Sequence, residues 1–166
     1  MSLQQLNTAA EPEARRCLLQ CCASKTWVSR LLERRPFAGA AQLREAADRA
    51  WRGLSEKDYL QAFAGHPEIG DLNSLRARYA DTSALAAGEQ SGVEGASDEL
   101  VEELQRGNRA YQEKFGFIFI VCATGKSAGE MLELLQQRLP NSREVELDNA
   151  VREQRKIFQL RLEKLL

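Results

Sequence analysis

Hydrophobic residues recur every three to four positions over most of this chain, which is the spacing of amphipathic α-helices. Polar residues able to cap a helix stand at the start of several such segments, among them Thr26, Ser55, Ser97 and Ser127. Helices are therefore predicted at about residues 12–23, 26–35, 40–52, 55–64, 97–114, 127–139 and 142–166, with a short helix and a loop over 72–85. The pattern predicts an all-α fold, in which residues 1–166 form a single-domain helical bundle.

One segment departs from the helical period. Residues 115–123, with the sequence FGFIFIVCA, form the most apolar run of the chain and have the local character of a β-strand. A strand needs a neighbour, and every other segment has helical spacing. We therefore predict a buried extended connector around residues 116–123. Its backbone N–H and C=O groups need partners other than a sheet, and a bound ligand is one candidate.

The next residues, ATGKS at 123–127, invite comparison with a phosphate-binding loop. That motif requires a glycine five residues before Gly125, and this position is Ile120. Ser127 and Glu130 instead have the spacing of a capping box at the start of a helix. Nucleotide binding is therefore rejected.

The last predicted helix carries two polar residues on its apolar face. Asn141 and Glu144 fit a capping box at its start. Its inner stripe consists of residues three or four apart: Leu147, Val151, Gln154, Phe158, Arg161 and Leu165. Burying a guanidinium without a partner is costly, so we expect Arg161 to meet a carboxylate or an anionic ligand. Spacing alone leaves open an internal salt bridge, for example with Glu89, and a contact with a substrate carboxylate.

His66 is the only histidine of the chain, and therefore its only side chain whose unperturbed pKa lies near neutral pH. The helix before it is well marked, because Ser55 and Asp58 fit a capping box and Gly65 suits the left-handed position that ends a helix. Pro67 then excludes helical geometry at His66. A single imidazole at a conformationally restricted position just after a helix is a candidate acid–base group. A single histidine is nevertheless more often a surface residue or a hydrogen-bonded structural residue.

Small residues gather between positions 86 and 92, where the sequence is AAGEQSG. Such residues let the backbone approach another group closely, and Glu89 and Gln90 place a carboxylate beside an amide. An ordinary solvated loop or helix start explains the same residues, and local grounds favour that interpretation.

The charges give no attraction toward polyanions. The 23 basic and 24 acidic residues leave a net charge of −1, so neither nucleic acid nor an anionic membrane is an expected partner. No stretch has the apolar length of a membrane span, and the first residues do not resemble a signal peptide. We expect a soluble, cytoplasmic protein.

The four cysteines do not form a metal-binding pattern. Cys17, Cys21 and Cys22 fall within one predicted helix and Cys122 is distant in sequence. No CxxC pair is present and a single histidine is available, so no metal site is predicted. Buried free thiols in a reducing compartment explain these residues.

Several short motifs occur in order from about residue 10 to the end of the chain. They are HPEIGD at 66–71, EQSG at 89–92, KFGF at 114–117 leading to FIVCA at 119–123, RL at 138–139 followed by Asn141, and KI at 156–157 leading to LRL at 160–162. Together they resemble the 2-oxo-4-hydroxy-4-carboxy-5-ureidoimidazoline (OHCU) decarboxylases, which make (S)-allantoin from oxidised urate. The order and spacing of the motifs carry the resemblance, since each is weak alone.

The resemblance implies an all-helical carboxy-lyase of urate and purine catabolism that needs no cofactor and no metal and forms a homodimer. Its implied catalytic residues are His66, Glu89 and Arg161. The residues implied to contact the ureidoimidazoline substrate are Pro67, Ala86, Gln90, Phe119, Ile120, Val121, Cys122 and Ala123. The family often has serine where this chain has Ala86, which removes one hydrogen bond. The C-terminal residues are not the peroxisomal tripeptide of eukaryotic relatives. A non-catalytic helical module that binds a ureide or a protein partner is the alternative.

Overall fold

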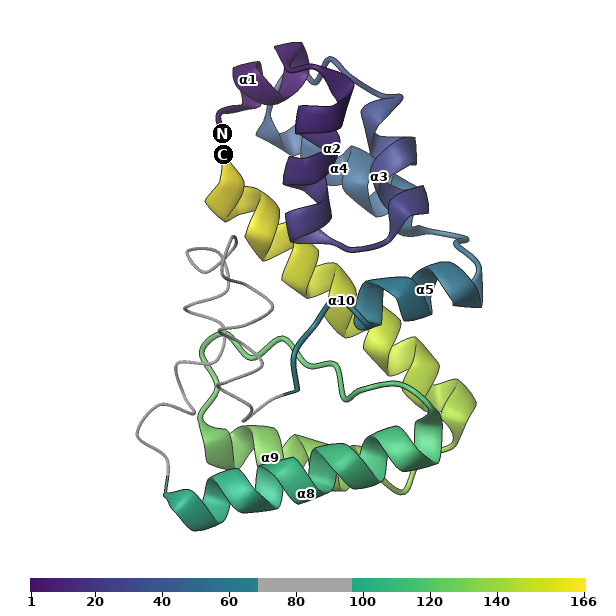
Figure 1. The fold of residues 1–166 in the computed structure, drawn as a ribbon, viewed down its shortest axis with the longest axis vertical. Coiled ribbons are helices and arrows are strands. Elements are labelled where there is room, and N and C mark those ends of the chain that lie inside the picture. Colours follow the sequence, from purple (N-terminus) through teal and green to yellow (C-terminus); the bar gives the residue numbers. More distant parts are fainter. Residues whose placement is uncertain (69–96) are drawn as a thin grey trace. The chain divides into compact units, whose positions relative to one another are not determined.

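The computed structural model of this protein describes residues 1–68 and 97–166 (Figure 1). These residues contain no strand and form the helices α1 (Leu3–Thr8), α2 (Glu11–Cys21), α3 (Lys25–Leu32), α4 (Ala40–Trp51), α5 (Glu56–Phe63), α8 (Asp98–Phe115), α9 (Ala128–Arg138) and α10 (Arg143–Leu165). The predicted all-α class is confirmed, and α1 is an addition to it. None of these helices is long and apolar enough to span a membrane.

The chain divides into two compact units. The first consists of residues 1–65 and 155–166, and the second of residues 66–154. The helix α10 therefore starts in the second unit and ends in the first. The organisation of residues 1–166 as a single domain stays a prediction.

Several helices begin where the sequence predicts. At α5 the Ser55 hydroxyl accepts a hydrogen bond from the Asp58 amide at 3.2 Å, and the Asp58 carboxylate accepts one from the Ser55 amide at 3.2 Å. Ser127 and Glu130 form the same capping box at α9. Ser97 caps α8 by accepting from the Leu100 amide at 3.3 Å. These side chains satisfy amide groups that the first turn of a helix leaves without partners.

Two predicted caps are wrong by one or two residues. The cap of α3 is Ser24, and Thr26 lies inside the helix, where its hydroxyl donates to the Asp58 carboxylate at 2.6 Å. At α10 the hydroxyl of Ser142 accepts from the amide of Val145 at 3.3 Å, in place of the predicted box at Asn141. In both cases two neighbouring polar residues are able to cap, and tertiary contacts decide between them.

Gly65 does not have the predicted left-handed conformation, since the positive φ values of the described residues belong to other glycines. The helix α5 ends instead at Ala64 with a right-handed φ of −62°. A Cβ atom at position 65 would lie 2.6 Å from the Cβ of Ala23. The glycine is therefore required for close packing against the chain between α2 and α3.

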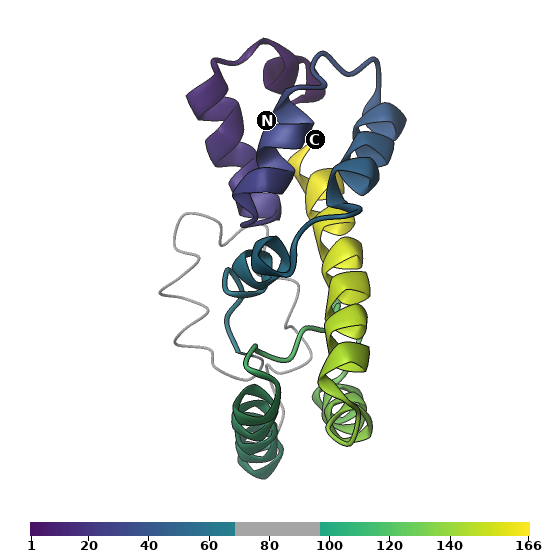
Figure 2. The ribbon, with the colours of Figure 1, turned by 90° about the vertical axis from the view of Figure 1, so that its right-hand side faces the viewer.

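The first unit has an aromatic core built on α10. The ring of Phe158 lies 5.1 Å from that of Trp27 and 5.5 Å from that of Trp51, measured between centroids. The indole nitrogen of Trp27 donates to the carbonyl of Ala47 at 3.0 Å, so α3, α4 and α10 meet here. The chain ends also lie close together in this unit (Figure 2), where the Met1 amine donates to the Leu165 carbonyl at 3.2 Å.

In the second unit α8 and α9 pack side by side (Figures 1 and 2). A Cβ atom at Gly107 of α8 would lie 2.5 Å from Leu135 of α9, so the glycine permits their close approach. Residues 117–123 belong to the segment that connects the end of α8 to the start of α9. They have no regular secondary structure, and all except Ile118 are buried. This segment is the predicted extended connector, which is confirmed.

Candidate functional site

His66 lies in the second unit, three residues after the end of α5. It is 8% exposed, and the neighbouring Pro67 is also buried. Its Nε2 atom lies 2.6 Å from Oε1 of Gln154 on α10. Because an amide oxygen can only accept, Nε2 carries the proton of this hydrogen bond. In the neutral ring Nδ1 is then the nitrogen that can take up a proton.

The sequence marks Gln154 only as a polar residue on an apolar helix face. Its partner could not be inferred, because 88 residues separate it from His66. No local motif joins two residues so far apart. The hydrogen bond is therefore a part of the candidate site that sequence analysis missed.

Three charged side chains hold the backbone of the connector. Arg138 Nη1 donates to the carbonyl of Ile120 at 2.7 Å. The carboxylate of Glu153 accepts from the amide of Cys122 at 2.8 Å, and Lys126 Nζ donates to the carbonyl of the same residue at 2.8 Å. The protein's own side chains thus supply some of the partners that the connector was predicted to need.

Other backbone groups of the connector have no partner in the part of the chain that the structure describes. Among residues 1–68 and 97–166, none hydrogen-bonds to the amide of Ile120 or to either backbone group of Val121. Both residues are buried, at 2% and 7% exposed. Buried backbone groups are nearly always paired in proteins, so these are the groups that a bound ligand would satisfy.

Glu146 is a fully buried carboxylate that sequence analysis also missed, because an acid in the first turn of a helix usually faces solvent. It accepts hydrogen bonds from four side chains: Tyr111, Arg138 at 2.8 Å, Asn141 at 2.8 Å and Asn149 at 2.7 Å. Since Arg138 also binds the Ile120 carbonyl, this network ties α8, α9 and α10 to the connector.

The network keeps Glu146 ionised. Burial raises the pKa of this carboxyl, but the hydrogen bonds from Asn141, Tyr111 and Asn149 and the charge of Arg138 outweigh burial and hold the pKa below 4.5. Burial, and then the hydrogen bond to Glu146, raises the pKa of the Tyr111 hydroxyl. At neutral pH the carboxylate is therefore charged and the phenol keeps its proton.

Arg161 belongs to the first unit, on the part of α10 beyond residue 155. It is 4% exposed, and its Nη1 donates to the carbonyl of Gln20 at 3.4 Å. Gln20 stands in the last turn of α2, where carbonyl groups lack helical partners and a cation is favourable. The salt-bridge partner considered from sequence, Glu89, lies outside the described residues.

All four cysteines are free and buried, as the sequence predicts. Burial raises the pKa of Cys22 to about 12, although the Ser24 backbone and the charge of Arg161 act in the opposite direction. The thiol therefore stays protonated at neutral pH and does not serve as a nucleophile. No group of three or more potential metal ligands is found in the described parts of the chain.

Ala86, Glu89 and Gln90 lie outside the described residues, as does the predicted short helix at 72–85. Of the residues predicted to act on substrate, His66 and the connector belong to the second unit and Arg161 belongs to the first.

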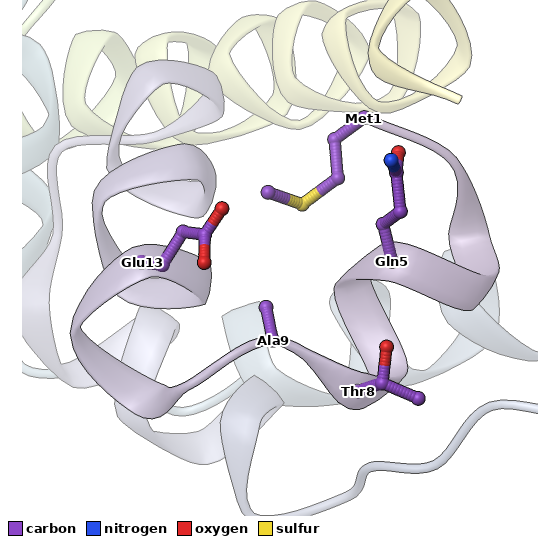
Figure 3. Close-up of a pocket in the computed structure, with 5 residues that line it drawn as sticks. All are labelled: Met1, Gln5, Thr8, Ala9 and Glu13. Carbon is purple, nitrogen blue, oxygen red and sulfur yellow. The ribbon is translucent and has the colours of Figure 1, made fainter.

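A surface pocket of about 420 Å³ lies between α1 and α2 (Figure 3). It is lined by Met1, Gln5, Thr8, Ala9 and Glu13. None of these residues is predicted to bind substrate, and Glu13 is the one acidic side chain among them. The pocket therefore contains none of the residues proposed for catalysis or substrate binding.

Solved structures share this fold. The chain is similar to a crystal structure of OHCU decarboxylase determined in the presence of (S)-allantoin, with a TM-score of 0.72 and 32% identity over 89% of this chain and 94% of that one. A crystal structure of (S)-allantoin synthase has a TM-score of 0.73 and 18% identity, and it covers 100% of this chain and 54% of that one. The second similarity shows the fold alone. Fold and comparison together define an all-helical protein of the decarboxylase class.

Sequence comparison identifies the family. The family model described as OHCU decarboxylase matches residues 7–163, so the chain belongs to the OHCU decarboxylase family. It is 28% identical over 164 residues to the OHCU decarboxylase of Haloferax volcanii, which covers 98% of this chain and 94% of that protein. It is 36% identical over 146 residues to the uric acid degradation bifunctional protein TTL of Arabidopsis thaliana. That match covers 87% of this chain and 45% of the relative, so the chain spans less than half of the bifunctional protein. The family, lyase class and urate catabolism predicted from sequence are confirmed.

Proposed function

We propose that this chain converts 2-oxo-4-hydroxy-4-carboxy-5-ureidoimidazoline to (S)-allantoin, with His66 as the acid–base group. The observation that carries the proposal is the position of the only imidazole of the chain. It is buried beside Pro67 and hydrogen-bonded through Nε2 to Gln154, which leaves Nδ1 as the basic nitrogen of the neutral ring.

The reaction needs one proton-transfer group and a stereospecific environment. The substrate loses carbon dioxide from the carbon that bears its hydroxyl and carboxylate groups. The electron pair of the broken bond passes toward the adjacent ring C=N, whose nitrogen takes a proton from water. The resulting enol becomes a carbonyl as the ureido-bearing carbon is protonated on one face. His66 takes the hydroxyl proton and helps to deliver it to that carbon.

The remaining residues have proposed binding roles. Arg161 stabilises negative charge on a substrate oxygen or orients the carboxylate. The family resemblance gives Glu89 the role of holding the imidazole or a ring N–H, and Gln90 the role of orienting the ureido group, with Pro67 and Ala86 lining the same pocket. The amide of Ile120 and the backbone of Val121, which have no hydrogen-bond partner among the described residues, support a further role for residues 119–123, in which the connector binds polar atoms of the substrate.

Release of carbon dioxide from freshly generated substrate tests this function. Purified protein should release it far faster than the spontaneous decay measured without protein. The acceleration should survive exhaustive chelation, because the proposed chemistry uses protein groups alone. Decay at the spontaneous rate would favour the alternative, a non-catalytic helical module that binds a ureide or a protein partner.

We also propose that the chain acts as a cytoplasmic homodimer. The dimer rests on the family resemblance, and the compartment on the four buried free thiols, which fit a reducing environment. Light scattering after size-exclusion chromatography should give twice the mass of one chain, and a monomer mass at working concentrations would contradict the dimer.

A further inference from the structure

Of the two polar atoms in the Gln154 amide, Oε1 has a hydrogen-bond partner among the described residues and Nε2 has none. The residue is fully buried. Its Oε1 accepts from His66 at 2.6 Å, whereas Nε2 is buried and has no hydrogen-bond partner among the residues that the structure describes. A buried donor without an acceptor is costly, so native proteins seldom keep one without a reason.

We propose that Gln154 is a positioning residue for His66 and that its Nε2 binds an oxygen atom of the substrate. The proposal rests on the acid–base role proposed for His66. The amide oxygen can only accept, so it selects the neutral tautomer of His66 that carries hydrogen on Nε2 and leaves Nδ1 as the base. The amide nitrogen is bonded to the same carbon as that oxygen, so its N–H groups lie beside the imidazole. A substrate that exchanges a proton with the ring places its hydroxyl, carboxylate or carbonyl oxygen in the same neighbourhood.

The neutrality of this side chain matters for the proposed chemistry. A carboxylate at position 154 would also accept from Nε2, but its charge would favour the imidazolium form of His66 and repel the carboxylate of the substrate. An amide fixes the tautomer without charging the ring. It also supplies a donor, which a carboxylate does not.

The tautomer of His66 can be measured directly, because the chain contains a single histidine. In protein labelled with ¹⁵N-histidine, long-range ¹H–¹⁵N spectra contain one imidazole spin system. At a pH where the ring is neutral, the proposal predicts a protonated Nε2 and an unprotonated Nδ1. Gln154→Met should shift the ¹⁵N resonances toward those of the tautomer protonated on Nδ1, because the acceptor that favours a proton on Nε2 is then missing. A proton on Nδ1 in the wild-type protein, or an unchanged tautomer in Gln154→Met, would overturn the proposal.

Gln159→Met is a matched control on the same helix. Gln159 donates to the Arg44 carbonyl at 3.0 Å and to the Asp48 carboxylate at 2.7 Å, both in the first unit. Its replacement also removes a glutamine from α10, but it should leave the ¹⁵N shifts of His66 and the turnover unchanged. An equal change in both variants would mean that the spectra report a general disturbance of α10.

Kinetics separate the two roles of the amide. Gln154→Glu keeps the acceptor for His66, lacks the N–H donor and adds a negative charge, so KM should rise about tenfold and the pH dependence of kcat should move to higher pH while Nε2 stays protonated. Gln154→Met lacks both groups, so kcat should also fall by about 10- to 100-fold. Unchanged kcat and KM in a folded Gln154→Met protein would refute the proposal, and this variant decides the question if Gln154→Glu does not fold. Full activity of His66→Asn would instead refute the acid–base role, whatever the tautomer measurement shows.

Discussion

At the scale of single residues, the proposed chemistry depends most on His66. Replacing it with asparagine, which is similar in size, should preserve the fold. The asparagine amide is shorter than the ring and leaves Oε1 of Gln154 without its donor, which should lower stability by about 1 kcal/mol. Turnover of fresh substrate should fall by about 10²- to 10⁴-fold, because no other imidazole is present. A His66→Asn protein with full activity would remove the imidazole from the mechanism.

The Arg161→Met variant tests whether Arg161 stabilises the fold or contacts the substrate. If it faces the substrate, Arg161→Met should leave the melting temperature nearly unchanged and lower turnover by about 10²- to 10³-fold, as when an oxyanion donor is removed. A purely structural arginine would instead leave a buried partner unpaired and cost about 3 kcal/mol or more of stability.

Arg155→Met is the control for Arg161→Met, because Arg155 pairs with Asp48 in the same unit through a half-exposed side chain. It should affect neither turnover nor, to any large extent, stability. An Arg161→Met protein that melts much earlier but turns over normally at low temperature would contradict the catalytic role.

The sequence identified several residues of the candidate site, but it did not identify the groups that they contact. His66, Gln154 and Arg161 each stand out in the sequence by residue type or by position on a helix face. Their recorded partners do not, because the Gln154–His66 bond joins residues 88 apart and the Arg161 bond ends on a backbone carbonyl. Gly65 shows the same limit, since the sequence indicated a glycine requirement but not the close contact with Ala23 that causes it.

At the scale of elements, capping residues and helical periodicity predicted where most helices lie. The break in that period predicted the connector as well. The charged side chains that hold it could not be predicted, because Arg138 and Glu153 reach it from α9 and α10 only in the folded chain. Glu146 was missed for the same reason, since three of its donors lie outside its own helix.

Glu146→Gln should destabilise the second unit. Arg138, whose side chain is 12% exposed, would lose its carboxylate partner, and such a loss typically costs about 3–5 kcal/mol. Urea denaturation at neutral pH measures this change. Glu130→Gln is the control, because Glu130 caps α9 at an exposed position and its loss should cost less. Equal urea midpoints for Glu146→Gln and the wild type would contradict a stabilising network.

The same carboxylate predicts a pH dependence. The folded pKa of Glu146 is below 4.5, so between that pKa and 4.5 the unfolded chain binds more protons than the folded one. Its contribution to stability is present above pH 4.5 and is lost as the pH falls through the folded pKa. The difference in unfolding free energy between wild type and Glu146→Gln should therefore shrink on acidification below pH 4.5, and a constant difference would contradict it.

At the scale of the whole molecule, the family was predictable because its motifs are read in order along the chain, and the family model spans residues 7–163. The two compact units were not predictable, because they are defined by contacts between distant segments. The helix α10 contributes Gln154 to one unit and Arg161 to the other, and periodicity alone treats it as a single stripe.

The proposed reaction combines decarboxylation of the substrate with protonation of the intermediate on one face. Circular dichroism of a mixture with freshly generated substrate measures both the rate and the handedness of the product. We expect an immediate signal of (S)-allantoin, which is chiral, whereas uncatalysed decay gives a racemate with no signal. Slow formation of racemic allantoin, at the rate found without protein, would show that the chain does not catalyse this reaction.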